Sequence, residues 1–203
     1  MKNPYKAQNI AFFFLFLATL LIVVPVGLIV VIIVQKGLPG ISWQFLSDIP
    51  RQGMRAGGIF PAIIGTLYLV SGAIVFALPI GLLAAIYLSE YSKDNLLNRV
   101  IKLAIVNLAG VPSVVYGLFG LALFVVFFKF GASIIAGSLT LGIMVLPIII
   151  TASREALESV PYSFREVSLS LGASKWQTIR HIVLPNAVPG ILTGTILGLG
   201  RAA

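Results

Sequence analysis

Long uncharged stretches alternate with short polar stretches along this chain of 203 residues. The first uncharged stretch covers 10–34 and reads IAFFFLFLATLLIVVPVGLIVVIIV. At 1.5 Å per residue it forms a helix of about 37 Å, which crosses a bilayer with some tilt. The apolar core of a cleaved signal peptide is shorter, roughly 7–15 residues. We therefore expect this helix to be retained as a membrane span.

Three further apolar stretches predict membrane helices, and a fourth begins close to the end of the chain. The three cover 60–88, 103–128 and 130–153, and the last runs from Ala187 to the final residue. The stretch 103–128 is interrupted by Asn107 and by GVPS at 110–113. Only the short sequence KFGAS, at 129–133, separates two of them, which predicts a tight helical hairpin. The pattern predicts an all-α, polytopic transmembrane bundle with four complete spans and part of a fifth.

The distribution of lysine and arginine predicts the orientation of this bundle. These residues are more frequent in 1–9, 89–102 and 154–185 than in 35–59 and 129–133. Cytoplasmic loops carry the excess of basic residues, so we expect the N-terminus and the segment 154–185 to be cytoplasmic. We expect three parts, an N-terminal helix, an external loop and a membrane domain, covering 1–36, 37–59 and 60–203.

Composition excludes several classes of function. The chain is 59% hydrophobic and 10% charged, whereas soluble domains carry about a quarter charged residues. It has no cysteine and a single histidine, His181, so thiolate and multi-histidine metal sites are excluded. The net charge is +8, but the basic residues are scattered over loops and form no nucleic-acid-binding motif. We therefore expect the protein to contact membrane lipid and not to bind nucleic acid.

The polar segment 154–185 has the pattern of two short helices joined by a turn. Ser163 and Glu166 have the spacing of a capping box, which predicts the start of the first helix. Gly172 is placed where a helix ends or turns, and Ser174 is suited to cap a second helix, which a proline helps to end. Apolar positions on both helices predict contact with the membrane surface, with the chain's own bundle or with a soluble partner.

The order Glu166-Val-Ser-x-x-x-Gly172, then nine residues, then Ile182-x-Leu184-Pro185 resembles a known signature. It is the cytoplasmic loop Glu-Ala-Ala-x-x-x-Gly-x9-Ile-x-Leu-Pro of binding-protein-dependent ABC importer permeases, with the spacing intact. The resemblance implies that this segment is a coupling loop, which enters a cleft on an ATP-hydrolysing subunit. The residues it assigns to this role are Glu166, Gly172, Ala173, Ile182, Leu184 and Pro185.

The wider chain resembles the phosphate permeases of this family, and the PstA-type subunit more than the PstC-type subunit. The segments that carry the resemblance are ALPIGLLAAIYLSEY at 77–91, NLAGVPSVVYGLFG at 107–120, TASREALESVP at 151–161 and GRAA at 200–203. The family pattern continues beyond GRAA into further helix. Because the last apolar stretch is also too short to cross a bilayer, we expect the chain to be truncated.

The resemblance also implies partners and a location. The partners are a homologous permease subunit, two copies of a cytoplasmic ATPase and an external phosphate-binding protein. ATP and Mg²⁺ would bind to the ATPase, and this chain would hold no cofactor, no metal and no catalytic residue. The location is the cytoplasmic membrane of a bacterium or archaeon.

Four polar residues within or beside apolar stretches are candidates for an anion pathway, namely Arg201, Arg154, Ser113 and Asn107. Arg201 lies about 20 Å along the last helix, and an arginine at such depth is a functional hypothesis by default, because its planar fork matches phosphate oxygens. The alternative is a pair with a carboxylate or snorkelling to the surface. Arg154 serves equally well as a cytoplasmic anchor. Ser113 and Asn107 also fit helix–helix hydrogen bonds.

Glycines recur every four residues on the last helix, at Gly190, Gly194 and Gly198, which predicts close helix packing. The partner of this face is either the sister permease or a helix of the same chain.

Three alternatives to a phosphate permease stay open. A permease for another oxyanion, sulfate or molybdate, would carry the same coupling loop, although GVPSVVYGLFG and GRAA favour phosphate. A membrane enzyme would need paired acids, a nucleophile with its base, or a metal cluster, and the charged residues between Ile10 and Ser153 are confined to loops. A non-transporting membrane scaffold would not need a coupling signature with intact spacing.

Overall fold

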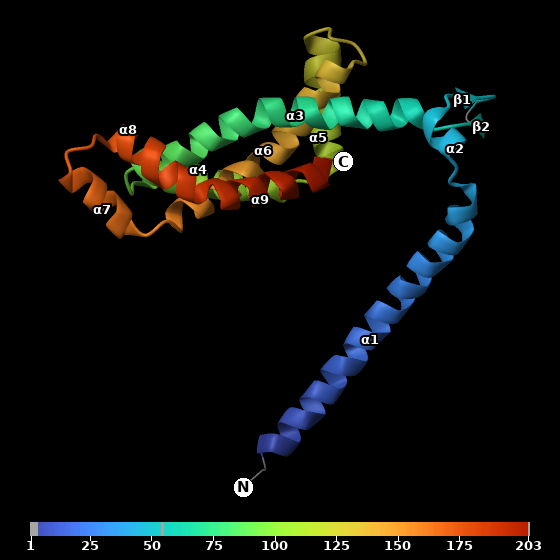
Figure 1. Cartoon of the computed structure of the whole chain (residues 1–203), viewed down its shortest axis with the longest axis horizontal. Coiled ribbons are helices and arrows are strands. Elements are labelled where there is room, and N and C mark those ends of the chain that lie inside the picture. Colours follow the sequence, from blue (N-terminus) through green and yellow to red (C-terminus); the bar gives the residue numbers. More distant parts are fainter. Residues whose placement is uncertain (1–3, 54, 203) are drawn as a thin grey trace. The chain divides into compact units, whose positions relative to one another are not determined.

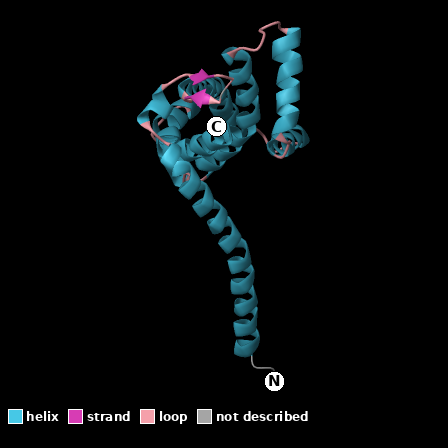
Figure 2. Ribbon diagram, turned by 90° about the vertical axis from the view of Figure 1, so that its right-hand side faces the viewer, coloured by secondary structure: helices cyan, strands magenta, loops and turns pink. Residues whose placement is uncertain are grey.

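The computed structural model describes residues 4–53 and 55–202. Almost all of this chain is helical, with two short strands, as Figure 2 shows. It divides into two units, Met1–Ala62 and Ile63–Ala203, which we describe separately. The last residue of the GRAA motif lies outside the described residues.

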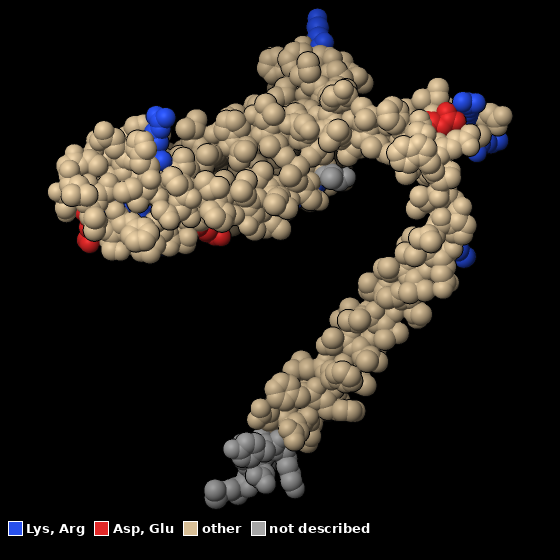
Figure 3. Space-filling model, in the orientation of Figure 1, with Lys and Arg blue, Asp and Glu red and all other residues tan. Residues whose placement is uncertain are grey.

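The first unit consists of one long apolar helix and a small folded loop. The candidate span Gln8–Gly40 covers most of helix α1 (Pro4–Gly37) and the short turn after it, and none of that span's most apolar window is buried by the described chain. Residues 10–34 of α1 include no charged residue, and Figure 3 shows blue atoms near the C-terminal end of the helix. This stretch is therefore apolar on all sides and suited to lipid or to another membrane helix.

The loop after α1 is held by short-range contacts. It contains the 3₁₀ turn η1 (Leu38–Gly40), helix α2 (Trp43–Ser47) and two paired antiparallel strands, β1 (Pro50–Arg51) and β2 (Ala56–Gly57). The Ser42 hydroxyl caps α2 by accepting from the Phe45 amide at 3.1 Å.

The core of the second unit lies between α3 (Phe60–Ile86), α6 (Ile134–Glu158) and α9 (Leu184–Ala202), which Figure 1 shows in green, orange and red. Small side chains at the contacts let the helix backbones approach closely, as is usual in membrane bundles. The buried residues of the larger cluster are Ala85, Ile86, Ala156, Leu157, Val160, Ile179, Val183, Ala187 and Ile191.

The glycine face of α9 packs against α6 of the same chain. A Cβ added to Gly194 would lie 2.4 Å from the Ala152 Cβ, and one added to Gly190 would lie 2.6 Å from the Ala156 Cβ. Of the two partners considered for this face, the helix of the same chain is confirmed. The sister permease is not the partner of these glycines, because α6 already occupies the space.

The apolar stretch 103–128, predicted as one span, is bent. Helix α4 (Leu96–Ala109) and the pair α5 (Ser113–Gly120) and η3 (Leu121–Phe127) meet at 98°. Pro112 has no N–H to donate and disfavours helical geometry at the residue before it, and α4 ends before this point. The prediction of a single helix over this stretch is wrong, although its apolar character is the same on both sides of the bend.

The tight hairpin between η3 and α6 is confirmed. Lys129 and Gly131 have positive φ angles of 56° and 67°, and the Ser133 hydroxyl caps α6 by accepting from the Ala136 amide at 3.3 Å.

Among the described residues, four helices are long and apolar enough to cross a membrane, and the bent pair would make a fifth. This confirms the predicted all-α, polytopic fold. The four spans are Gln8–Gly40, Phe60–Tyr91, Ile134–Glu158 and Lys175–Ala202.

Candidate functional site

Two short helices follow α6, as predicted. They are α7 (Tyr162–Ser170) and α8 (Lys175–Thr178), and Gly172 joins them with a φ of +85°. Only glycine adopts this left-handed conformation without strain, which explains its place in the pattern. The two helices lie together at one end of the second unit (Figure 1).

The cap predicted for the first of these helices is wrong, whereas Ser174 caps the second helix as predicted. Pro161 precedes α7 and no side chain caps its start, so the predicted box between Ser163 and Glu166 is wrong. The fixed φ of proline starts the helix before Ser163 is reached. A capping box exists instead on α8, where the Ser174 hydroxyl accepts from the Gln177 amide and Gln177 Oε1 accepts from the Ser174 amide at 2.7 Å.

Pro185 was predicted to help end the second helix, and this prediction is wrong. The chain continues from α8 through a π-helical turn, η4 (Ile179–Val183), into α9, and Lys175–Ala202 forms one continuous candidate span. The wider turn just before the proline relieves the clash of its ring with the preceding carbonyls. The Asn186 side chain donates to the Ile182 carbonyl at 2.7 Å and satisfies that oxygen. The end of the coupling signature is therefore part of the same rod as the membrane helix.

The residues of the coupling signature are distributed between the surface and the core. Glu166 is exposed on α7, Gly172 forms the turn, and Ala173 is half-buried beside it. Leu184 packs against the larger buried cluster, and Ile182 is also partly buried. Pro185 is exposed.

Exposed apolar side chains lie on both sides of Glu166 along α7 and α8. Leu171 is 84% exposed, and its neighbours on α7 and α8 are also open. An exposed apolar patch of this kind marks a contact surface rather than a water-facing one. The residues that form it are Tyr162, Phe164, Val167, Leu169, Leu171 and Trp176.

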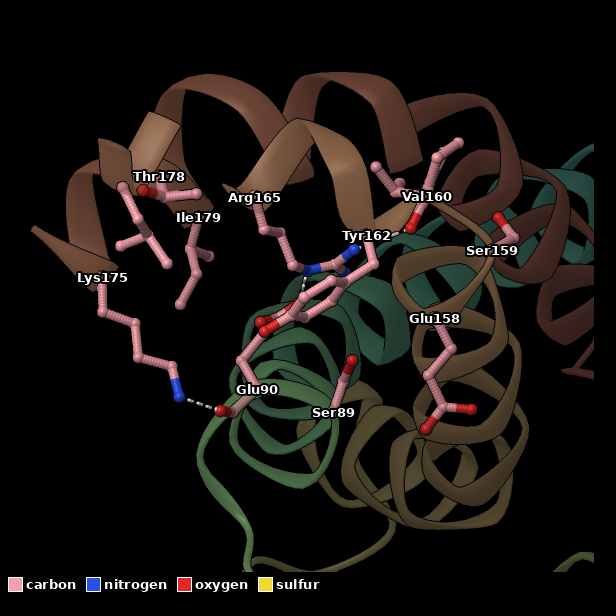
Figure 4. A pocket seen from close by; sticks show the side chains of 12 residues that line it. Ser89, Glu90, Glu158, Ser159, Val160, Tyr162, Arg165, Lys175, Thr178 and Ile179 are labelled. Carbon is pink, nitrogen blue, oxygen red and sulfur yellow. Dashed lines mark hydrogen bonds and ion pairs between the residues drawn. The ribbon is translucent and has the colours of Figure 1, made fainter. Parts of the chain in front are cut away.

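Arg165, in the first turn of α7, forms a largely buried ion pair that the sequence did not predict. We call this contact the base of α7. Arg165 Nη2 lies 2.7 Å from Glu90 Oε1, and the two side chains are only 12% and 8% exposed. The same guanidinium donates to the carbonyls of Val160, at 2.7 Å, and Leu157, at 2.9 Å. Figure 4 shows these groups meeting beside a pocket of about 530 Å³. Arg165 had been counted only as one of the cytoplasmic basic residues.

Lys175 adds a second contact to the same place. Its ammonium donates to the Glu90 carbonyl and lies 4.8 Å from the centre of the Tyr91 ring. Both residues belong to η2 (Tyr87–Tyr91), the π-helical end of α3. The available signal in the sequence was the carboxylate of Glu90 at the end of an apolar stretch. No local spacing links it to Arg165, which lies 75 positions later.

Arg201, the leading candidate for the anion pathway, contacts the bend between α4 and α5. Its Nη1 donates to the Ala109 carbonyl at 2.7 Å, and its Nη2 donates to the Val111 carbonyl at 3.2 Å. Arg201 is exposed, and no carboxylate of residues 4–53 and 55–202 pairs with it. The predicted candidates Asn107 and Ser113 flank the same bend and are exposed.

Arg154 lies elsewhere, toward the C-terminal end of α6. Its Nε is 3.7 Å from Glu158 Oε1, and its side chain is 21% exposed. It borders a very small cavity together with Lys102 and Thr151. The structure thus brings three of the four predicted pathway residues to one bend and leaves Arg154 at a separate cavity, where its role stays a prediction.

Residues 77–203 match the family described as the binding-protein-dependent transport system inner membrane component. The chain belongs to this permease family. It is 33% identical over 184 residues to the probable ABC transporter permease protein YqgI of Bacillus subtilis (strain 168), which covers 91% of this chain and 62% of that protein. It is 35% identical over 200 residues to the phosphate transport system permease protein PstA 1 of Mycobacterium tuberculosis (strain CDC 1551 / Oshkosh), covering 96% and 65%.

The permease chain therefore spans somewhat less than two thirds of the length of these relatives. Its fold is similar to a chain of the MetNI methionine ABC transporter, solved in inward-facing conformations. The TM-score is 0.57 at 21% identity, over 71% of this chain and 68% of that one. The predicted family and the multi-pass membrane fold are confirmed.

Proposed function

We propose that this permease chain belongs to an ATP-driven importer of inorganic phosphate. The observation that carries the proposal is the exposed α7–α8 pair, which presents Glu166 on an apolar surface while its base is buried against the membrane helices. The relatives named as phosphate permeases support the choice of anion.

The apolar surface around Glu166 would dock into a cleft of a cytoplasmic ATPase. Apolar anchors that surround a single polar group are typical of protein interfaces. Two copies of that ATPase bind ATP and Mg²⁺, and this chain contributes no catalytic residue and no cofactor site. Closure of the ATPase pair displaces α7 and α8, and the membrane helices then reorient by alternating access.

The remaining partners follow from the same proposal. The N-terminus and the α7–α8 pair face the cytoplasm of a bacterium or archaeon, since the basic residues gather there. A second, homologous permease completes the pathway, and an external binding protein delivers phosphate to the opposite side.

Arg201 would contact the anion during passage. Its present partners are neutral carbonyls, and charge-assisted bonds to phosphate oxygens are stronger than bonds to such groups. An incoming oxyanion can therefore replace the carbonyls of Ala109 and Val111 without breaking an ion pair.

The direct test is uptake by cells. The full-length gene product and its partner subunits are expressed in a strain that lacks its own phosphate permeases, and uptake of radiolabelled phosphate is measured with and without excess sulfate or molybdate. We expect ATP-dependent phosphate uptake that neither competitor inhibits. Uptake of sulfate or molybdate instead would replace the proposed substrate. Assembly with the ATPase but no uptake of any oxyanion would favour the scaffold alternative.

A further inference from the structure

We propose that the Glu90–Arg165 pair is a positioning element, which makes α7 move as one body with the ends of α3 and α6. This inference rests on the proposed function in one respect, that an ATPase displaces α7. It assigns a role to two residues outside the coupling signature, one on each side of the contact between the cytoplasmic loop and the membrane bundle.

Three elements meet at the guanidinium of Arg165. The carboxylate of Glu90 belongs to the end of α3, and the carbonyls of Leu157 and Val160 belong to the end of α6 and the residues just after it. Nε, Nη1 and Nη2 all donate. A planar fork with several fixed donors holds its partners in one geometry, which a flexible ammonium group would not do.

Burial makes this junction stiff. The two side chains are 12% and 8% exposed, so water competes for these contacts less than it does at an exposed pair. The pair Arg154–Glu158 is the contrast on α6, because it is longer, at 3.7 Å, and its acid is 47% exposed. Exposed pairs of this kind contribute little to the position of a helix.

The second helix of the pair is fixed to the same base. Lys175 donates to the Glu90 carbonyl, and the hydroxyls of Ser168 and Thr178 are 2.9 Å apart in a buried contact between α7 and the end of α8. The turn at Gly172 is different, because no atom lies within 4 Å of a Cβ built there. The α7–α8 pair is therefore held against the bundle at its base, and open space surrounds the turn at Gly172, the tip of the pair.

The test uses the full-length permease in its complex, reconstituted in liposomes. The ratio of phosphate transported to ATP hydrolysed is measured for the wild type, Glu90→Gln and the control Glu158→Gln. We expect Glu90→Gln to hydrolyse ATP at a rate close to the wild type while the ratio falls by about fivefold or more. The control should keep the wild-type ratio. A wild-type ratio in Glu90→Gln, or the same loss in both variants, would overturn the inference.

A distance measurement separates this inference from the phosphate assignment. The chain has no cysteine, so spin labels are placed at Ser163→Cys on α7 and Leu83→Cys on α3, both exposed positions. The distance distribution should be narrow in the wild type and broader in Glu90→Gln. Equal widths would overturn the positioning role even where transport is lost. A broadened distance distribution in a complex that does not transport phosphate would uphold the positioning role. It would reject only the assignment of phosphate as the substrate.

Discussion

Two arginines of this permease occupy similar places and differ in how their charge is balanced. Arg165 and Arg201 each donate to backbone carbonyls near the end of a helix. The helix is α6 for Arg165 and α4 for Arg201. A cation at a helix C-terminus interacts favourably with the free carbonyls and with the helix dipole. In both places the guanidinium donates to oxygens at the end of a helix or just beyond it.

The difference lies in the third partner. Arg165 also holds the carboxylate of Glu90 and is almost fully buried, so its charge is neutralised inside the protein. Arg201 holds only neutral oxygens and is exposed, with no carboxylate partner in the described part of the chain. The same residue type is thus committed to structure in one region and left free to attract an anion in the other.

The largest expected effect is on the buried pair. Arg165→Met leaves Glu90 as an uncompensated buried charge, which should lower the free energy of unfolding by about 3–5 kcal/mol. The double variant Glu90→Leu with Arg165→Met should recover most of that loss, because no charge stays buried. Denaturant unfolding in detergent, followed by circular dichroism, measures both. A double variant as unstable as the single one would contradict the view that the buried charge is the cause.

The next effect concerns transport and not stability. Arg201→Gln should lower phosphate uptake roughly 10- to 100-fold, the equivalent of one charge-assisted contact, because the neutral amide cannot balance the anion. Arg201→Lys keeps the charge and should lose less, although it cannot form a fork. Uptake of radiolabelled phosphate by the full complex measures both variants. Equal uptake by the glutamine variant and the wild type would remove Arg201 from the pathway.

The position of Arg201 depends on how α9 packs, which gives a third test. Gly194→Ala places a Cβ 2.4 Å from the Ala152 Cβ, and such overpacking should cost about 1–3 kcal/mol. Gly200→Ala on the same helix is the control, because its Cβ meets no atom within 4 Å. Thermal unfolding of the two variants should separate them clearly. Similar melting temperatures would show that α9 is not held against α6 as described.

The smallest effect is expected at the tip of the α7–α8 pair. Gly172→Ala should cost about 1 kcal/mol, because a left-handed backbone strains any residue with a Cβ while the site itself is open. Gly117→Ala, at an exposed and equally open position with ordinary helical geometry, is the control. Denaturant unfolding measures the difference. A loss as large as that of Arg165→Met would mean that the tip, and not the base, holds the pair.

Local pattern predicted the features whose cause is local. Apolar stretches identified the long helices, and the glycine of the coupling signature identified the turn between α7 and α8. The bend at Pro112 was visible as an interruption, but composition on its two sides is the same, so nothing indicated its angle. The π-helical turn before Pro185 was not predictable, because proline usually stops a helix and the relief comes from backbone geometry.

Long-range contacts were beyond this kind of reasoning. Glu90 and Arg165 meet because three helices end at one place, and no spacing in the sequence encodes that meeting. Arg201 was predicted as a candidate for the anion pathway, with a carboxylate pair or snorkelling to the surface as the alternatives. Its actual partners are backbone carbonyls at a bend, which have no signature in the sequence of either segment.

The most direct test of the difference between the two arginines is the amount of phosphate transported per ATP in Glu90→Gln and Arg201→Gln, measured side by side in the reconstituted complex after subtraction of basal hydrolysis. The account predicts a lower ratio in Glu90→Gln, because the displacement of α7 is lost before it reaches the membrane. In Arg201→Gln we expect an unchanged ratio of phosphate to ATP at a much lower transport rate. Fewer transport cycles take place, but each completed cycle still moves phosphate. The same change of rate and ratio in both variants would contradict the account.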